Sequence, residues 1–183
     1  MKSLGTRIGA IISCVLVSSG SLIAGEAPKT PAVGDPAPPV AGKDQDGKDW
    51  KLSDALGKNM VLLYFYPKDD TPGCTKEACG FRDRIGELKA DGVEVIGVSF
   101  DSAESHQKFA HKYGLNFPLL VDTDGKIADA YGTRMPGKNM DRRVSFLIGR
   151  DGKVAHVTDN MSADAHLSEM KEAVAGLKAK EKA

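Results

Sequence analysis

The chain has 183 residues with 25 basic and 25 acidic side chains, so its formal net charge at pH 7 is zero. This balance gives no electrostatic reason to expect nucleic acid or an anionic membrane surface as a partner. The length suits one domain that buries a core of its own, and a hydrophobic content of 41% argues against global disorder.

The N-terminal segment, residues 1–25, differs from the rest of the chain. Basic residues precede an apolar run over 8–17, and small residues dominate 18–25. This order is typical of a secretory signal peptide, so we expect export to the periplasm and cleavage near 24–27, with no lasting membrane contact. The apolar run is too short and interrupted to favour an uncleaved anchor. Lipidation at Cys14, within a sequence that resembles a lipoprotein cleavage box, is an open alternative.

Prolines concentrate in residues 26–39, which we expect to form an extended lead-in, and the domain itself is expected to occupy 40–183. Residues 60–66 form an almost uninterrupted apolar run, which is typical of a buried central strand. Cys74 and several apolar side chains then recur at helical spacing, which predicts a helix over about 73–90.

The remaining elements alternate in the same way. Ser102 is suited to cap a helix that Gly114 ends, and Asp151-Gly152 is a hairpin signal. We predict further strands at 93–100, 117–121, 144–148 and 154–157, further helices at 102–113, 124–131 and 162–177, and a small hairpin around 44–47. This order indicates an α/β fold with a central mixed β-sheet flanked by helices. The thioredoxin-like fold fits it, although alternation alone would fit other folds.

The junction between the first long strand and its helix carries the candidate nucleophile. Pro72 fits the first helical position, which makes Thr71 the N-cap. Cys74 then lies in the first turn, where unpaired backbone N–H groups and the helix dipole favour a thiolate, the reactive form of cysteine. A buried structural cysteine is the alternative. The helix start, the strand end at Pro67 and the nearby Cys79 together favour the reactive one.

At this junction the sequence resembles the peroxiredoxins. Pro67, Thr71 and Cys74 match their Pro-x-x-x-Thr-x-x-Cys signature, and residues 71–79 resemble the peroxiredoxin Q branch, also called bacterioferritin comigratory proteins. The resemblance extends from residue 33 to the final predicted helix. It implies a thioredoxin-like fold and a peroxidase that reduces hydrogen peroxide and organic hydroperoxides. Thioredoxin or a similar dithiol would be the reductant, and no metal or organic cofactor would be needed.

The resemblance also implies roles for single residues. Cys74 would be the peroxidatic cysteine, which becomes a sulfenic acid. Cys79 would be the resolving cysteine, which condenses with it to an intramolecular disulfide. Thr71 would hydrogen-bond the substrate oxygens, and Pro67 would shield the site from water.

An arginine from a distant strand completes the family's site in an Arg-x-Ser/Thr-Phe pattern, which residues 143–146 match. Arg143 is therefore the expected guanidinium beside the thiolate. The side chain of its neighbour Arg142 should point the other way on a strand. The preceding stretch, 132–142, is shorter than the loop of many family members and lacks their aromatic residues, which leaves substrate preference open.

Two other functions share some of these features. An exported thiol–disulfide oxidoreductase normally carries Cys-x-x-Cys, whereas four residues separate Cys74 from Cys79 here. A copper-binding or assembly module would want a closer cysteine pair and a partnered histidine, and the histidines form no ligand pattern in the sequence. We expect a monomer or weak homodimer.

Overall fold

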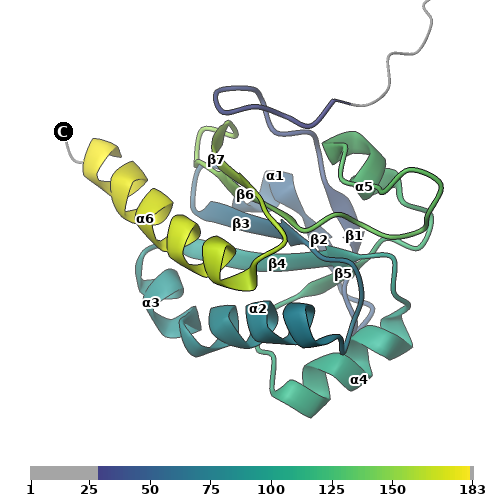
Figure 1. The fold of residues 1–183 in the computed structure, drawn as a ribbon. Helices are drawn as coiled ribbons and strands as arrows, with labels where there is room; N and C mark the ends of the chain where they lie inside the picture. The colour runs from purple at the N-terminus through teal and green to yellow at the C-terminus, as the bar shows by residue number, and fades with distance from the viewer. Residues whose placement is uncertain (1–28, 182–183) are drawn as a thin grey trace, which may run out of the picture.

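The computed structural model describes residues 29–181, which fold into a sheet covered by helices on both faces (Figure 1). In chain order the elements are β1 (Ala41–Lys43), β2 (Asp49–Lys51), α1 (Leu52–Ala55), β3 (Met60–Phe65), α2 (Pro72–Asp83), α3 (Ile85–Ala90), β4 (Val93–Ser99), α4 (Ala103–Tyr113), β5 (Leu119–Val121), α5 (Lys126–Tyr131), β6 (Val144–Ile148), β7 (Val154–Asp159) and α6 (Ala163–Glu181).

The main sheet has the strand order β5-β4-β3-β6-β7. β3 runs parallel to β4, and β4 to β5, whereas β6 is antiparallel to both β3 and β7. The predicted α/β fold with a central mixed sheet is thus confirmed. The β1–β2 hairpin around 44–47 and the β6–β7 hairpin at Asp151-Gly152 also form as predicted.

The central strand β3 explains the apolar run that encodes it. All six of its residues are buried, because strands lie on both sides of it and helices cover both faces of the sheet. One face packs against α2, α3, α4 and α6, with Phe81, Phe109 and Met170 among the buried residues. The other face packs against α1, α5 and the β1–β2 hairpin, with Leu52 and Tyr131 among them.

The helix predicted over 73–90 is two helices, which corrects the sequence expectation. α2 ends at Asp83 and α3 begins at Ile85, with Arg84 between them at φ −103° and ψ 5°. The Arg84 guanidinium donates to the carbonyl of Leu167 on α6, 2.9 Å away. We attribute the break to this tertiary contact and to Gly86, which weakens the helix just after it.

The lead-in lies along the β6–β7 hairpin. The Gly34 N–H donates to the Val154 carbonyl at 2.8 Å, and the Ala37 N–H to the Gly152 carbonyl at 2.9 Å. The predicted signal peptide and Cys14 lie outside the described residues. Within residues 29–181, no helix combines the length and apolar character that crossing a membrane requires.

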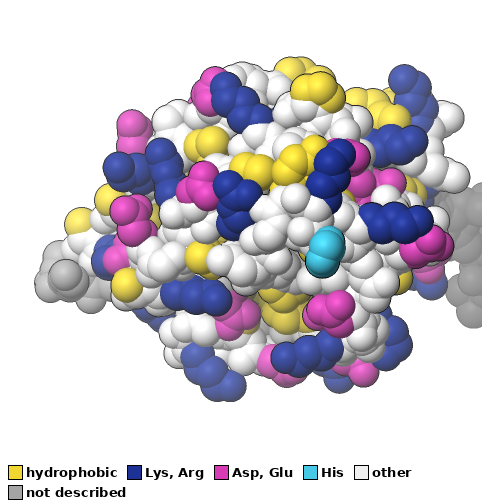
Figure 2. All heavy atoms as spheres, turned by 90° about the horizontal axis from the view of Figure 1, so that it is seen from below, with side chains coloured by type: hydrophobic (Ala, Val, Ile, Leu, Met, Phe, Trp, Pro, Cys, Tyr) yellow, Lys and Arg dark blue, Asp and Glu magenta, His cyan; other side chains and the backbone are white. Residues whose placement is uncertain are grey.

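The surface that carries α4 has no patch of a single charge. Figure 2 views the molecule from below relative to Figure 1 and shows basic and acidic side chains interspersed over this face. Many of them are paired, as Lys108 is with Glu104 at 2.6 Å and Lys112 with Asp70 at 2.7 Å. The basic and acidic side chains are therefore mixed on this face as well as balanced in number over the chain.

Candidate active site

The loop after β3 delivers the chain to the start of α2. Thr71 is the N-cap, with extended backbone at φ −93° and ψ 150°, and Pro72 occupies the first turn, as predicted. The Thr71 hydroxyl does not cap the helix. It donates instead to the Lys68 carbonyl at 3.1 Å, so its proton is committed while its oxygen can still accept a hydrogen bond.

Hydrogen bonds that Asp69 accepts and donates hold this loop in place. Its carboxylate accepts from Tyr66 Oη at 2.8 Å and from Ser105 Oγ at 2.7 Å, and lies 2.9 Å from His106 Nδ1. The Asp69 N–H donates to the Asp101 carboxylate at 2.9 Å. These contacts tie the loop to α4 and to the end of β4. They thereby fix the position at which α2 begins.

The next residue, Asp70, adopts a left-handed backbone at φ 56°. Aspartate is among the few residues that tolerate this conformation. Its carboxylate accepts from Lys112 at 2.7 Å and from Tyr113 Oη at 2.5 Å, which fixes the turn from the side of α4.

Sheet topology brings Arg143 to Cys74. β6 is antiparallel to β3 with Val144 opposite Phe65, so the residue before β6 lies at the sheet edge where β3 ends. Arg143 Nη2 donates to the Cys74 sulfur at 3.3 Å, and both residues are buried, at 4% and 1% exposure. Arg142 points away, toward Asp159, as predicted.

Arg143 is fixed from two further sides. Its Nε donates to the Met161 carbonyl at 3.2 Å, and its Nη1 donates to the carboxylate of Glu77, which is fully buried one turn after Cys74. Burial opposes the charge of Arg143, but Glu77 and Cys74 outweigh it and raise the pKa of the guanidinium. Burial raises the pKa of Glu77 to about 7, although Arg143 opposes that shift.

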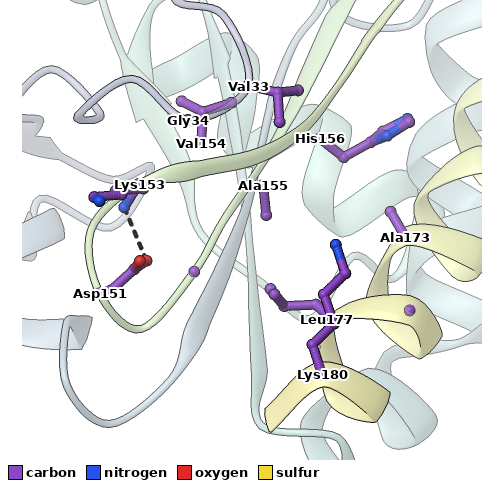
Figure 3. Close-up of a pocket in the computed structure, with 12 residues that line it drawn as sticks. Val33, Gly34, Asp151, Lys153, Val154, Ala155, His156, Ala173, Leu177 and Lys180 are labelled. Carbon is purple, nitrogen blue, oxygen red and sulfur yellow. Dashed lines mark hydrogen bonds between the residues drawn. The ribbon is translucent and has the colours of Figure 1, made fainter.

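The Cys74 sulfur is buried and does not line the hollow shown in Figure 3. That hollow, of about 410 Å³, lies between β7 and the end of α6 and is lined by residues such as Val33, Ala155 and Lys180. None of the predicted site residues lines it. Because the Cys74 thiol is 1% exposed, the part of a substrate that reacts with it must be small.

Comparison with known proteins agrees with this geometry. The profile of the AhpC/TSA family matches residues 33–157. "Peroxiredoxin Bcp" of Escherichia coli (strain K12) is 46% identical over 139 residues, which are 73% of this chain and 88% of the relative. The chain belongs to the peroxiredoxins.

Two solved structures share its architecture. "Peroxidoxin BcpB from Mycobacterium tuberculosis" superposes with a TM-score of 0.74 at 37% identity, covering 81% of this chain and 97% of the other. The bacterioferritin comigratory protein of Xanthomonas campestris gives a TM-score of 0.68 at 31% identity, covering 77% and 91%. The thioredoxin-like peroxiredoxin fold expected from the resemblance is therefore confirmed.

The second cysteine of this peroxiredoxin lies on the same intact helix. Cys74 and Cys79 are both free thiols, and Cys79 is partly exposed. Both fall within α2. This is the reduced arrangement of the pair.

Sequence reasoning missed Glu77 and His166, which lie behind Arg143. Glu77 falls on the buried stripe of α2 with Cys74 and Ala78, and His166 on the buried stripe of α6 with Met170. A charged or titratable residue within an otherwise apolar stripe was the available signal. Within residues 29–181, no cluster of His, Cys, Asp and Glu suits a metal ion.

Gly73 allows Arg143 to approach the sulfur. A Cβ at position 73 would lie 3.0 Å from Arg143 Nη2, tighter than ordinary packing. We therefore expect Gly73→Ala to displace the guanidinium and to lower the second-order rate constant with hydrogen peroxide by about tenfold. Gly86→Ala is the matched control, because a Cβ there meets open space. Equal rates for the two variants would show that Arg143 tolerates the shift.

Proposed function

We propose that this peroxiredoxin reduces hydrogen peroxide and organic hydroperoxides with Cys74 as the attacking group. The observation that carries the proposal is the 3.3 Å contact between Arg143 Nη2 and the Cys74 sulfur at the N-terminus of α2. A guanidinium and a helix N-terminus both favour the thiolate. The Xanthomonas relative is described in connection with alkyl peroxide reduction activity, which supports organic hydroperoxides as substrates here.

The chemistry follows from this geometry. The Cys74 thiolate attacks the terminal oxygen of the hydroperoxide, an S–O bond forms and the O–O bond breaks. The departing oxygen takes up a proton and leaves as water or an alcohol. Arg143 stabilises the negative charge that moves from sulfur to that oxygen. Thr71 Oγ1 donates its own proton to the Lys68 carbonyl, so it accepts a hydrogen bond from the O–H of the substrate. Half-buried Pro67 shields the site.

Cys79 then resolves the sulfenic acid. Its thiol attacks the Cys74 sulfur, a disulfide forms and water leaves. An external dithiol of the thioredoxin type reduces the disulfide, which is the reductant that the family implies. We propose a monomer or a weak homodimer as the working unit.

Thiol stoichiometry tests the function. One equivalent of hydrogen peroxide should remove two free thiols from the reduced protein, and peptide mapping should find a Cys74–Cys79 bond. The same thiols should react far more slowly with a protein disulfide than with hydrogen peroxide, because Cys74 is buried. Fast exchange with protein disulfides and slow loss of thiols to peroxide would instead favour a thiol–disulfide oxidoreductase.

Export is proposed from the N-terminal sequence. The mature chain should begin near residues 25–28 and lie outside the cytoplasm, as the order of basic, apolar and small residues suggests. Intact-mass measurement and cell fractionation check both points. A full-length cytoplasmic protein would contradict export, and a lipid-modified Cys14 would favour the lipoprotein alternative.

A further inference from the structure

A row of buried polar side chains continues from Arg143 away from Cys74. Glu77 on α2, Ser145 on β6 and His166 on α6 are each 0% exposed. His166 Nδ1 lies 2.7 Å from Ser145 Oγ and 3.3 Å from Glu77 Oε1. The row therefore connects α6 to the reacting sulfur through Glu77 and Arg143.

The hydrogen positions along this row can be worked out from its geometry. His166 Nε2 lies 2.8 Å from the Asn160 carbonyl, which only accepts, so Nε2 carries a hydrogen and Nδ1 of a neutral ring holds a lone pair. That lone pair faces two groups: the Ser145 hydroxyl at 2.7 Å, which donates to it, and Glu77 Oε1 at 3.3 Å. Glu77 Oε1, which faces Nδ1, is buried and makes no hydrogen bond within the described chain. A buried carboxylate oxygen without a donor is costly. A proton on either facing atom removes that cost.

We propose that Glu77 and His166 hold one proton between Oε1 and Nδ1, and that His166 is thereby a positioning residue for Arg143. The proposal rests on the function proposed above for Cys74 and Arg143. With the proton in place the Glu77–His166 pair has no net charge, so Arg143 directs its full charge to the Cys74 thiolate. When the proton leaves, Glu77 becomes a carboxylate that competes with the thiolate for the same guanidinium.

Burial favours an uncharged Glu77, while the charge of Arg143 opposes it. Arg143 faces it from the start of β6, Tyr64 from β3 and His166 from α6, while Cys74 lies on its own helix. Burial raises the pKa of Glu77 to about 7, against the opposing effect of Arg143. Burial also raises the pKa of Tyr64 well above its usual value, so Tyr64 stays neutral.

The groups around His166 favour a neutral ring. Burial lowers the pKa of His166, and the charge of Arg143 lowers it further. The hydrogen bond to the Asn160 carbonyl opposes the shift, as do Glu169 on α6 and Asp159 at the end of β7. A protonated carboxyl beside a neutral imidazole is therefore the favoured form up to about pH 7, the value to which the pKa of Glu77 is raised. Above it the pair loses its proton.

The pH dependence of the peroxide reaction tests the proposal. The second-order rate constant of the reduced protein with hydrogen peroxide should fall by about tenfold as the pH rises above neutral. Glu77→Gln keeps an oxygen for Arg143 and cannot ionise, so this fall should disappear. Glu104→Gln is the matched control: it removes an exposed carboxylate on α4 that pairs with Lys108, and the fall should remain. An unchanged fall in Glu77→Gln would overturn the proposal.

Nitrogen NMR of ¹⁵N-histidine-labelled protein gives a readout that needs no peroxide. The Nδ1 resonance of His166 should show a step near neutral pH in the wild type, and Glu77→Gln should remove it. A protein that failed as a peroxidase would still report on the pair, so the two failures are distinguishable. A wild-type spectrum without the step would overturn the proposal even if the variant did not fold.

Discussion

Replacing Cys74 with serine is expected to abolish peroxide turnover, lowering the rate by at least about 10³-fold. A serine hydroxyl at the start of α2 stays protonated where a thiol ionises, and it cannot form the sulfenic acid through which the cycle runs. Arg143 would still lie beside position 74, but it would face no anion. Peroxide consumption in a coupled assay with a thioredoxin-type donor measures the loss.

Cys79→Ser is the matched variant, because it changes the same element and leaves Cys74 and Arg143 in contact. It should react with the first equivalent of peroxide at a nearly unchanged rate and then stop as a sulfenic acid that a dimedone-type probe traps. Turnover that survived in Cys74→Ser would remove Cys74 from the mechanism. Loss of the first step in Cys79→Ser would mean that Cys79 does more than resolve.

Oxidation is expected to unwind the first turns of α2. The two cysteines are five residues apart on this helix, which places their Cα atoms some 8–9 Å apart. A disulfide rarely spans more than about 7 Å between Cα atoms. The intact helix seen in the structure therefore cannot hold the bond, and its residues between Cys74 and Gly80 must leave the helix before the sulfurs meet.

The structure shows what this unwinding breaks. The contact of Cys74 with Arg143 and the ion pair of Lys76 with Asp164 at 2.5 Å would both be lost. Gly80 would also move away from α6. In the intact structure, a Cβ at position 80 would clash with a Leu167 methyl. Its lack of a side chain thus allows α2 and α6 to approach closely, besides lowering the cost of leaving the helix by roughly 1 kcal/mol relative to alanine. Phe81, which is 2% exposed, marks where the helix should persist.

Hydrogen-exchange mass spectrometry on the reduced and oxidised forms decides the point. Amides over 74–80 should exchange much faster after oxidation, while those of α4, an element separate from the cysteines, should keep their protection and serve as the internal control. Equal protection over 74–80 together with a mapped Cys74–Cys79 bond would contradict the geometric argument. A bond between Cys79 residues of two chains would preserve the peroxidase but change how it is resolved.

Local patterns in the sequence were enough to predict most elements and to single out Cys74 as the candidate nucleophile. The apolar run of β3, the Ser102 cap and the Gly114 stop of α4 are short-range signals, and the structure confirms each of them. The same holds for Thr71 and Pro72, because N-cap and first-turn preferences depend only on neighbouring backbone. Arg143 was found through resemblance, since no local rule places a residue 69 positions away beside Cys74.

The sequence by itself determined the strand–helix junction that presents Cys74, because helix termini and buried strands are encoded by adjacent residues. Only the tertiary structure decided which charges surround that sulfur. The antiparallel pairing of β6 with β3 brought in Arg143, and the packing of α6 on α2 buried Glu77 against His166. The break at Arg84 has the same origin, a contact with the Leu167 carbonyl. Such long-range contacts depend on how elements pack, and no local periodicity records that packing.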